Sequence, residues 1–286
     1  MNSPPPSAVL VLGMVRSGTS AITRLLGLLG MELGPEDRLL APAENVNPKG
    51  YYEHREIVRL NAELLKRMGG SWRLPPSLPV GWQRAPALED LRARARALLE
   101  ADFAGARLWG FKDPRTSLTL PFWEDLLGEA LLGEARYVIC HRRPLDSARS
   151  LERRNGIGLD DGVALWMRYT ASALAHTAEK RRIVVGYEEL FTNRDSLVGE
   201  LVAFLDVPAP DTSRELRAAV DDWIEDGLRH HAGTLRELIE HPAVATDARV
   251  LDLLLELAVS SRRREQDSVG VAGALDAMAR RLLLLS

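Results

Sequence analysis

Four short apolar runs, separated by segments with helical periodicity, set the pattern of this chain. The runs are residues 8–12, 108–111, 136–140 and 182–185, and each is followed by glycine or polar residues. Continuous apolar runs of this length are typical of strands that are buried on both faces of a parallel sheet. The alternation of strand and helix therefore predicts an α/β fold, with a P-loop-like central parallel sheet flanked by helices.

Helical spacing of apolar residues predicts helices over residues 20–29 and from about residue 53 to 68, with glycines directly after each. Residues 71–86 contain four prolines and are predicted to form a long loop, which is either a lid or acceptor-facing wall of a substrate site or an idle surface loop. Beyond Leu205 the pattern is mostly helical, and residues 206–286 are expected to pack on the same domain.

Composition narrows the class of protein. Of the 286 residues, 46% are hydrophobic and 27% are charged, which fits one folded domain over residues 1–286 with a flexible segment at 1–7. A net charge of −3 argues against a nucleic-acid binder, which needs surplus cations. No apolar stretch is long enough to span a membrane. The single cysteine, Cys140, cannot form an intramolecular disulfide, so a cytoplasmic location is expected.

The segment after the first predicted strand has the spacing of a phosphate-binding loop. Gly13 and Gly18 lie five residues apart, and Ser20 supplies a hydroxyl group. Such glycines allow a tight turn whose N–H groups, with the positive end of the next helix, attract an anion. Thr19 stands where a nucleoside triphosphatase has its lysine, and the nearest cation is Arg16 instead. A glycine-rich turn without a ligand is the alternative.

A second candidate anion site follows the third predicted strand. Arg142 comes directly after this strand, and Ser150 lies eight residues later on a helix that Pro144 opens. An arginine with a hydroxyl group suits a phosphate, and the carboxyl ends of parallel strands share one sheet edge. Five arginines fall between residues 142 and 154, and a solvated basic helix face is the other explanation for them.

These motifs together resemble the sulfotransferases that use 3′-phosphoadenosine 5′-phosphosulfate (PAPS), over most of the chain. The stretch 184–190 is similar to an apolar strand and Tyr-Glu-Asp-Leu segment of that family. The resemblance implies transfer of a sulfuryl group to a hydroxyl acceptor, such as a carbohydrate, lipid or natural product, with no metal required. It implies that the 5′-phosphosulfate is held by Arg16, Ser17, Gly18, Thr19 and Ser20, and the 3′-phosphate by Arg142 and Ser150.

The chain departs from the cytosolic small-molecule branch of that family. It has Arg16 in place of lysine, Asp113 after the second strand in place of the catalytic histidine, and no C-terminal clasp beyond a loose substitute at 262–264. The run from Lys112 to Pro114 is more similar to tyrosyl-protein and bacterial carbohydrate or natural-product sulfotransferases. Those enzymes place a catalytic glutamate downstream of the first loop, and Glu53 is the best match.

The chemistry of sulfuryl transfer resembles phosphoryl transfer, in which the protein mainly positions the reactants and stabilises charge. Arg16 and Lys112 would supply that charge stabilisation, and Glu53 would take the proton of the acceptor hydroxyl. His54 and Asp113 are rival bases. A small-molecule kinase with Asp113 at a magnesium ion is the alternative enzyme, and a nucleotide-binding scaffold without catalysis is a third hypothesis.

Overall fold

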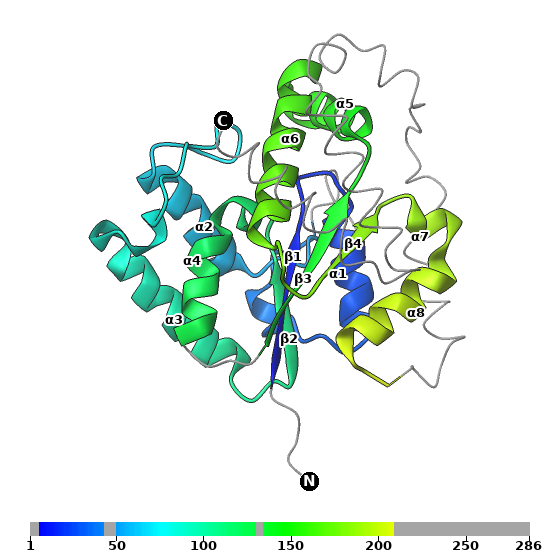
Figure 1. Cartoon of the computed structure of the whole chain (residues 1–286), viewed down its shortest axis with the longest axis horizontal. Helices are drawn as coiled ribbons and strands as arrows, with labels where there is room; N and C mark the ends of the chain where they lie inside the picture. Colours follow the sequence, from blue (N-terminus) through cyan, green and yellow to red (C-terminus); the bar gives the residue numbers. More distant parts are fainter. Residues whose placement is uncertain (1–5, 43–49, 130–133, 209–286) are drawn as a thin grey trace.

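A four-stranded parallel sheet forms the centre of the protein (Figure 1). The computed structural model describes residues 6–42, 50–129 and 134–208. The strand order is β2-β1-β3-β4, so β1 lies between β2 and β3. The strands are β1 (Ser7–Leu12), β2 (Leu108–Lys112), β3 (Glu134–His141) and β4 (Arg182–Gly186). The predicted α/β class and all four predicted strands are confirmed.

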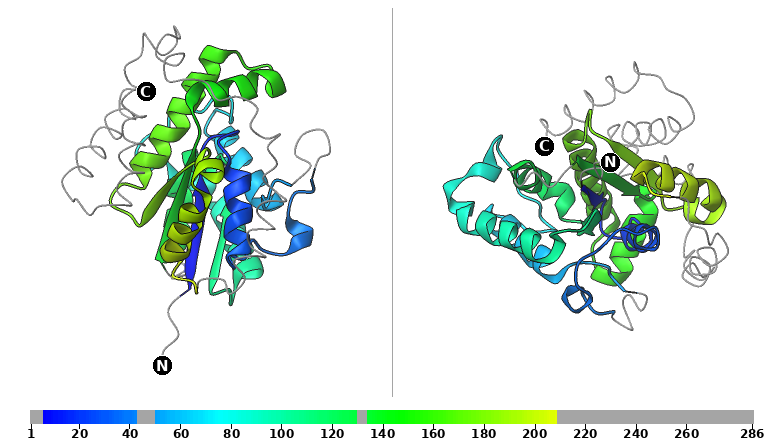
Figure 2. Two further views of the ribbon diagram at one scale, coloured as in Figure 1. Left: turned by 90° about the vertical axis from the view of Figure 1, so that its right-hand side faces the viewer. Right: turned by 90° about the horizontal axis from the view of Figure 1, so that it is seen from below.

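Helices cover both faces of the sheet (Figure 2). Alternate residues of β1 point to opposite faces, with Val9 and Val11 in one hydrophobic cluster and Leu10 and Leu12 in the other. The first cluster is completed by α1 (Thr19–Leu28), α7 (Glu189–Thr192) and α8 (Arg194–Leu205). The second is completed by α2 (Arg55–Arg67), α3 (Glu89–Phe103), α4 (Thr116–Glu129), α5 (Pro144–Asn155) and α6 (Leu159–His176).

The start of α2 differs from the predicted start. The helix begins at Arg55 with His54 as its N-cap residue, so Glu53 precedes the helix instead of opening it. The reason is a short contact with the segment before it: the Leu40 N–H donates to the Glu53 carbonyl oxygen at 2.8 Å, and Leu39 and His54 form an isolated antiparallel bridge. This pairing holds residues 53 and 54 extended and turns Glu53 into a fixed residue at the sheet edge.

The predicted loop over 71–86 is mostly irregular and includes one short 3₁₀ turn, η2 (Trp82–Arg84), before η3 (Pro86–Leu88). A third turn, η1 (Glu36–Arg38), lies between α1 and α2. The predicted helical region beyond residue 208, the substitute clasp at 262–264 and residues 1–5 of the expected flexible segment lie outside the described residues. Within the described residues, no helix is long and apolar enough to cross a membrane.

Candidate active site

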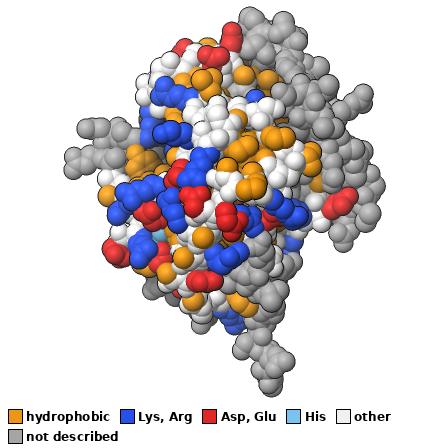
Figure 3. All heavy atoms as spheres, turned by 90° about the vertical axis from the view of Figure 1, so that its left-hand side faces the viewer, with side chains coloured by type: hydrophobic (Ala, Val, Ile, Leu, Met, Phe, Trp, Pro, Cys, Tyr) orange, Lys and Arg blue, Asp and Glu red, His pale blue; other side chains and the backbone are white. Residues whose placement is uncertain are grey.

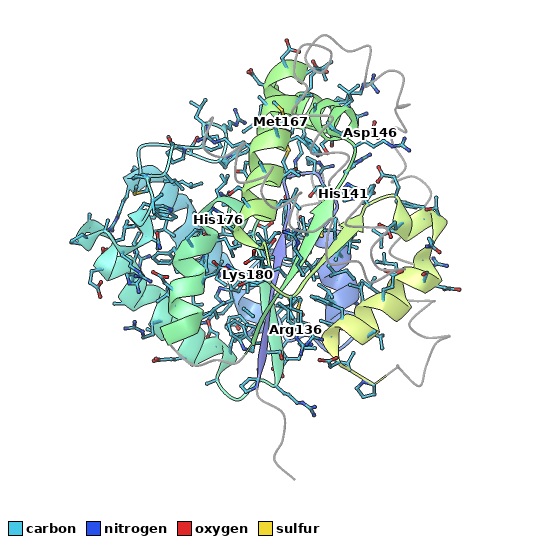
Figure 4. All side chains as sticks on the ribbon, in the orientation of Figure 1. Arg136, His141, Asp146, Met167, His176 and Lys180 are labelled. Carbon is cyan, nitrogen blue, oxygen red and sulfur yellow. The ribbon has the colours of Figure 1, made fainter. Side chains whose placement is uncertain are left out.

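A pocket of about 260 Å³ opens at the carboxyl ends of β1 and β2. Its walls come from the loop after β1, the extended stretch before α2, the turn after β2, the end of α5 and Trp72 of the 71–86 loop. Figure 4 marks this edge of the sheet: His141 ends β3 beside Asp146 of α5, whereas Arg136 lies toward the opposite end of the strand. The pocket therefore lies where ligands bind in open α/β sheets.

The loop after β1 turns through backbone conformations that favour glycine. Gly13 has φ 139° and Gly18 has φ 88°, and a Cβ atom on Gly18 would collide with the ring of Tyr187. Gly18 is the N-cap residue of α1 and has no side chain to satisfy the first N–H groups of the helix. Free N–H groups at the positive end of a helix attract anions, so this geometry is compatible with the predicted anion site.

Arg16 connects the two predicted anion sites. Its Nε donates to Ser150 Oγ at 2.8 Å, across 134 residues of sequence. Burial, together with the nearby charges of Arg154 and Arg142, lowers the pKa of Arg16 to about 10. At neutral pH the guanidinium remains charged, so a partly buried cation with other cations nearby lines the pocket. Such a group is stabilised by a bound anion.

Arg142 lies beneath Tyr187 on the other side of the loop. Its Cζ is 4.7 Å from the centroid of the Tyr187 ring, and the residue is 8% exposed. Its Nε is a buried donor with no hydrogen-bond partner among the described residues. The Trp166 indole N–H donates to the Arg142 carbonyl oxygen at 2.9 Å and fixes the backbone here. Trp166 itself is fully buried in α6.

Lys112 and Glu53 form a buried ion pair in the pocket wall. Lys112 Nζ lies 2.5 Å from Glu53 Oε1, and the two side chains are 2% and 12% exposed. The ammonium group also donates to Ser20 Oγ at 3.1 Å. Burial raises the pKa of Glu53 above its usual value, although the charge of Lys112 opposes that shift. The structure thus brings Ser20, Lys112 and Glu53 together from three separate elements.

Asp113 lines the pocket but has both carboxylate oxygens engaged. Oδ2 accepts a hydrogen bond from Asn61 Nδ2 at 2.9 Å, and Oδ1 accepts one from Arg115 Nη1 at 2.8 Å. Asn61 Oδ1 in turn accepts hydrogen bonds from Thr119 Oγ1 at 2.6 Å and Trp123 Nε1 at 2.8 Å. Sequence reasoning missed Asn61; a polar residue beside Leu60 on the apolar face of α2 was the available signal. This network fixes the turn after β2.

His54 does not line the pocket. Its Nε2 lies 3.0 Å from Asp102 Oδ2, and its ring packs against Phe103 with the centroids 6.0 Å apart. The side chain is fully buried, and burial lowers the pKa of the imidazole. His54 therefore anchors the stretch that carries Glu53 to α3.

Comparison with known proteins identifies the family of the chain. Residues 6–211 match the Sulfotransferase family, and since this is well over half of the chain, the protein belongs to that family. Among solved structures it is similar to a sulfotransferase domain from the curacin biosynthetic pathway, at 18% identity, TM-score 0.42 and 98% coverage of both chains. A sulfotransferase domain from the Synechococcus PCC 7002 olefin synthase matches at 17% identity and TM-score 0.41, covering 98% of this chain and 96% of that one. No curated protein shows significant similarity.

Proposed function

We propose that this sulfotransferase uses PAPS to transfer a sulfuryl group to a hydroxyl acceptor, and that Glu53 is the base. The observation that carries the proposal is that Arg16, Lys112 and Glu53 line one pocket at the carboxyl end of the sheet. Two cations and one carboxylate in one cavity match the needs of in-line transfer, in which charge must be stabilised and one proton removed.

The residues around the pocket fit a cofactor with two anionic ends. The N–H groups of the loop, with Arg16, Ser17, Gly18, Thr19 and Ser20, would hold the phosphosulfate. Arg142 and Ser150 would hold the 3′-phosphate, which gives the unpartnered Arg142 Nε an acceptor. When bound, PAPS supplies the sulfuryl group and leaves as adenosine 3′,5′-bisphosphate (PAP). The protein's own cations provide the positive charge, so no metal is required.

The ion pair between Lys112 and Glu53 supports Glu53 as the base. Glu53 Oε2 accepts the proton of the acceptor hydroxyl, and Lys112 holds Glu53 Oε1 in place at 2.5 Å. A carboxyl group whose pKa is raised by burial is a stronger base than an ordinary glutamate, which favours proton uptake. Arg16 and Lys112 stabilise the charge that develops on the transferred group and the leaving oxygen.

Two features disfavour the alternative of a magnesium-dependent kinase. Thr19 replaces the phosphate-neutralising lysine of nucleoside triphosphatases. Asp113, the residue proposed for magnesium in that hypothesis, already receives hydrogen bonds from Asn61 and Arg115 on its two oxygens. A metal ion there would have to break this network.

Thermal unfolding with PAP tests the cofactor. We expect PAP in EDTA to stabilise the protein by roughly 2.7 kcal/mol at about a hundred times its dissociation constant. We expect Arg142→Ala to lose most of that stabilisation because the variant lacks the cation for the 3′-phosphate. ADP and ATP, each with and without magnesium, are the comparison ligands. Stabilisation by ATP only with magnesium, and none by PAP, would contradict the proposal and favour the kinase.

The pH dependence of a His54→Gln variant tests the rival base. We expect a lower melting temperature because the buried bond to Asp102 is altered, and an unchanged pH at which kcat reaches half its maximum. His54 lies outside the pocket, so it does not exchange a proton with the acceptor. Loss or displacement of the acidic limb of the kcat profile in this variant would instead make His54 the base.

A further inference from the structure

The charges that line the pocket do not balance. Lys112 is paired with Glu53, and Arg115 is paired with Asp113 at 2.8 Å. Two lining cations remain: Arg16 and Arg154 have no carboxylate within ion-pair distance among the residues that the structure describes. A pocket that holds two neutralised pairs and two further arginines attracts anions.

This arrangement differs from the rest of the charged surface. On the face formed by α2 and α3, basic and acidic side chains are interspersed (Figure 3). There Arg67 contacts Glu63 at 2.6 Å and Asp90 at 2.5 Å, so its charge is neutralised. The excess of positive charge at the pocket is therefore a local feature in a chain with a net charge of −3.

The two unneutralised arginines come from different elements and differ in exposure, although the charge of Arg154 reaches Arg16. Arg16 is partly buried, belongs to the loop after β1 and donates a hydrogen bond to Ser150. Arg154 lies in the last turn of α5, is exposed, and donates from Nη2 to the hydroxyl oxygen of Tyr51 at 3.3 Å. A single phosphosulfate group on the loop would use Arg16, which leaves Arg154 for a second anion.

Apolar side chains complete the wall that includes Arg154. Leu40, Val58 and Trp72 line the same cavity, and Trp72 is held in place because its carbonyl oxygen accepts a hydrogen bond from Tyr169 Oη at 3.0 Å. An occupant of this part of the pocket thus meets apolar surface and an exposed guanidinium, with Glu53 in the same cavity.

We propose that the acceptor is a hydroxy acid: an apolar molecule with a hydroxyl group for Glu53 and a carboxylate that binds Arg154. The inference rests on the proposed function, because it assigns Arg16 to the cofactor and Arg154 to the acceptor. Guanidinium groups bind carboxylates through two parallel hydrogen bonds, which would also orient the hydroxyl group of the acceptor toward Glu53.

Calorimetric titration of the PAP-saturated protein tests this proposal. The probes are 3-(4-hydroxyphenyl)propionate and 3-hydroxydecanoate, each beside its primary amide. We expect the wild type to bind at least one acid about tenfold more tightly than its amide, and Arg154→Gln to abolish that preference. Arg153→Gln is the matched control: it makes the same change on the neighbouring exposed residue, which does not line the pocket, and should keep the preference.

Three results would overturn the proposal. The first is that neither acid binds more tightly than its amide. The second is that Arg153→Gln and Arg154→Gln lose the preference for the acid over its amide equally. That would mean that the general positive charge attracts the acid and that Arg154 does not contact its carboxylate. The third is that Arg154→Gln weakens PAP itself as strongly as Arg142→Ala does, which would assign Arg154 to the cofactor. Failure of the wild type to bind PAP is a separate result, and it would remove the proposed function as well.

Discussion

Replacing Glu53 with glutamine is expected to lower kcat by about a hundredfold to ten-thousandfold, with PAP affinity nearly unchanged. Glutamine keeps the shape of the side chain and can still accept a hydrogen bond from Lys112, but it cannot take up the proton of the acceptor hydroxyl. Steady-state kinetics beside a PAP titration separate the two effects. A variant that binds PAP normally and turns over slowly identifies Glu53 as a group of the chemical step.

The pH profile gives a second readout of the same variant. Burial raises the pKa of Glu53, and the base must be ionised to act, so kcat of the wild type should rise with pH through that raised pKa. Glu53→Gln should lack this acidic limb. Glu56→Gln is the matched control, because Glu56 lies outside the pocket and pairs with Arg59 on the surface of α2. Normal turnover in Glu53→Gln would contradict the assignment.

The strands could be predicted because each contains a short, mostly apolar run. A run such as 8–12 is buried on both faces, and no other element suits five consecutive apolar residues between glycine and polar segments. The ends of strands and helices were less predictable where backbone pairing with another segment determines them. His141 extends β3 because Gly186 of β4 lies beside it, and His54 stays extended because it pairs with Leu39. These partners are far away in the sequence.

The position of the site could also be predicted, because the motifs follow strands that end at one edge of a parallel sheet. The contacts between the motifs could not. Arg16 meets Ser150, and Asn61 joins Asp113 to α4, only because the crossovers place α5 and α2 beside those loops. Periodicity and spacing describe one element at a time. From the sequence alone Arg154 is part of a basic helix face, whereas the structure shows that it lines the pocket.

The buried ion pair should also have a large effect on stability. Lys112→Met is expected to lower the free energy of unfolding by about 3 kcal/mol, because it leaves the Glu53 carboxylate buried without its cation. The double variant with Glu53→Gln should recover much of that loss, since neither position of the pair then carries a charge. Chemical denaturation of the single and double variants measures both effects, and the difference between them is the coupling of the pair.

A surface pair supplies the control. Lys180→Met removes a cation from an ion pair with Glu124, but Lys180 is 38% exposed, so the cost should stay below about 1 kcal/mol. If Lys112→Met and Lys180→Met lower the free energy of unfolding equally, burial of the active-site pair does not increase its contribution to stability.

The pH dependence of the stability of Lys112→Met follows from the direction in which the pKa of Glu53 is shifted. Without Lys112, burial holds the pKa of Glu53 still further above its unfolded value, so the folded state binds the proton more readily than the unfolded chain. The loss of stability is therefore largest at pH values above the pKa that Glu53 has in the folded state. It becomes smaller as the pH falls through that value, because the carboxylate is then protonated. We expect the stability gap between this variant and the wild type to be smaller at acidic pH than at alkaline pH. A gap that widens on acidification would mean that the lost interaction is not a carboxylate–ammonium pair.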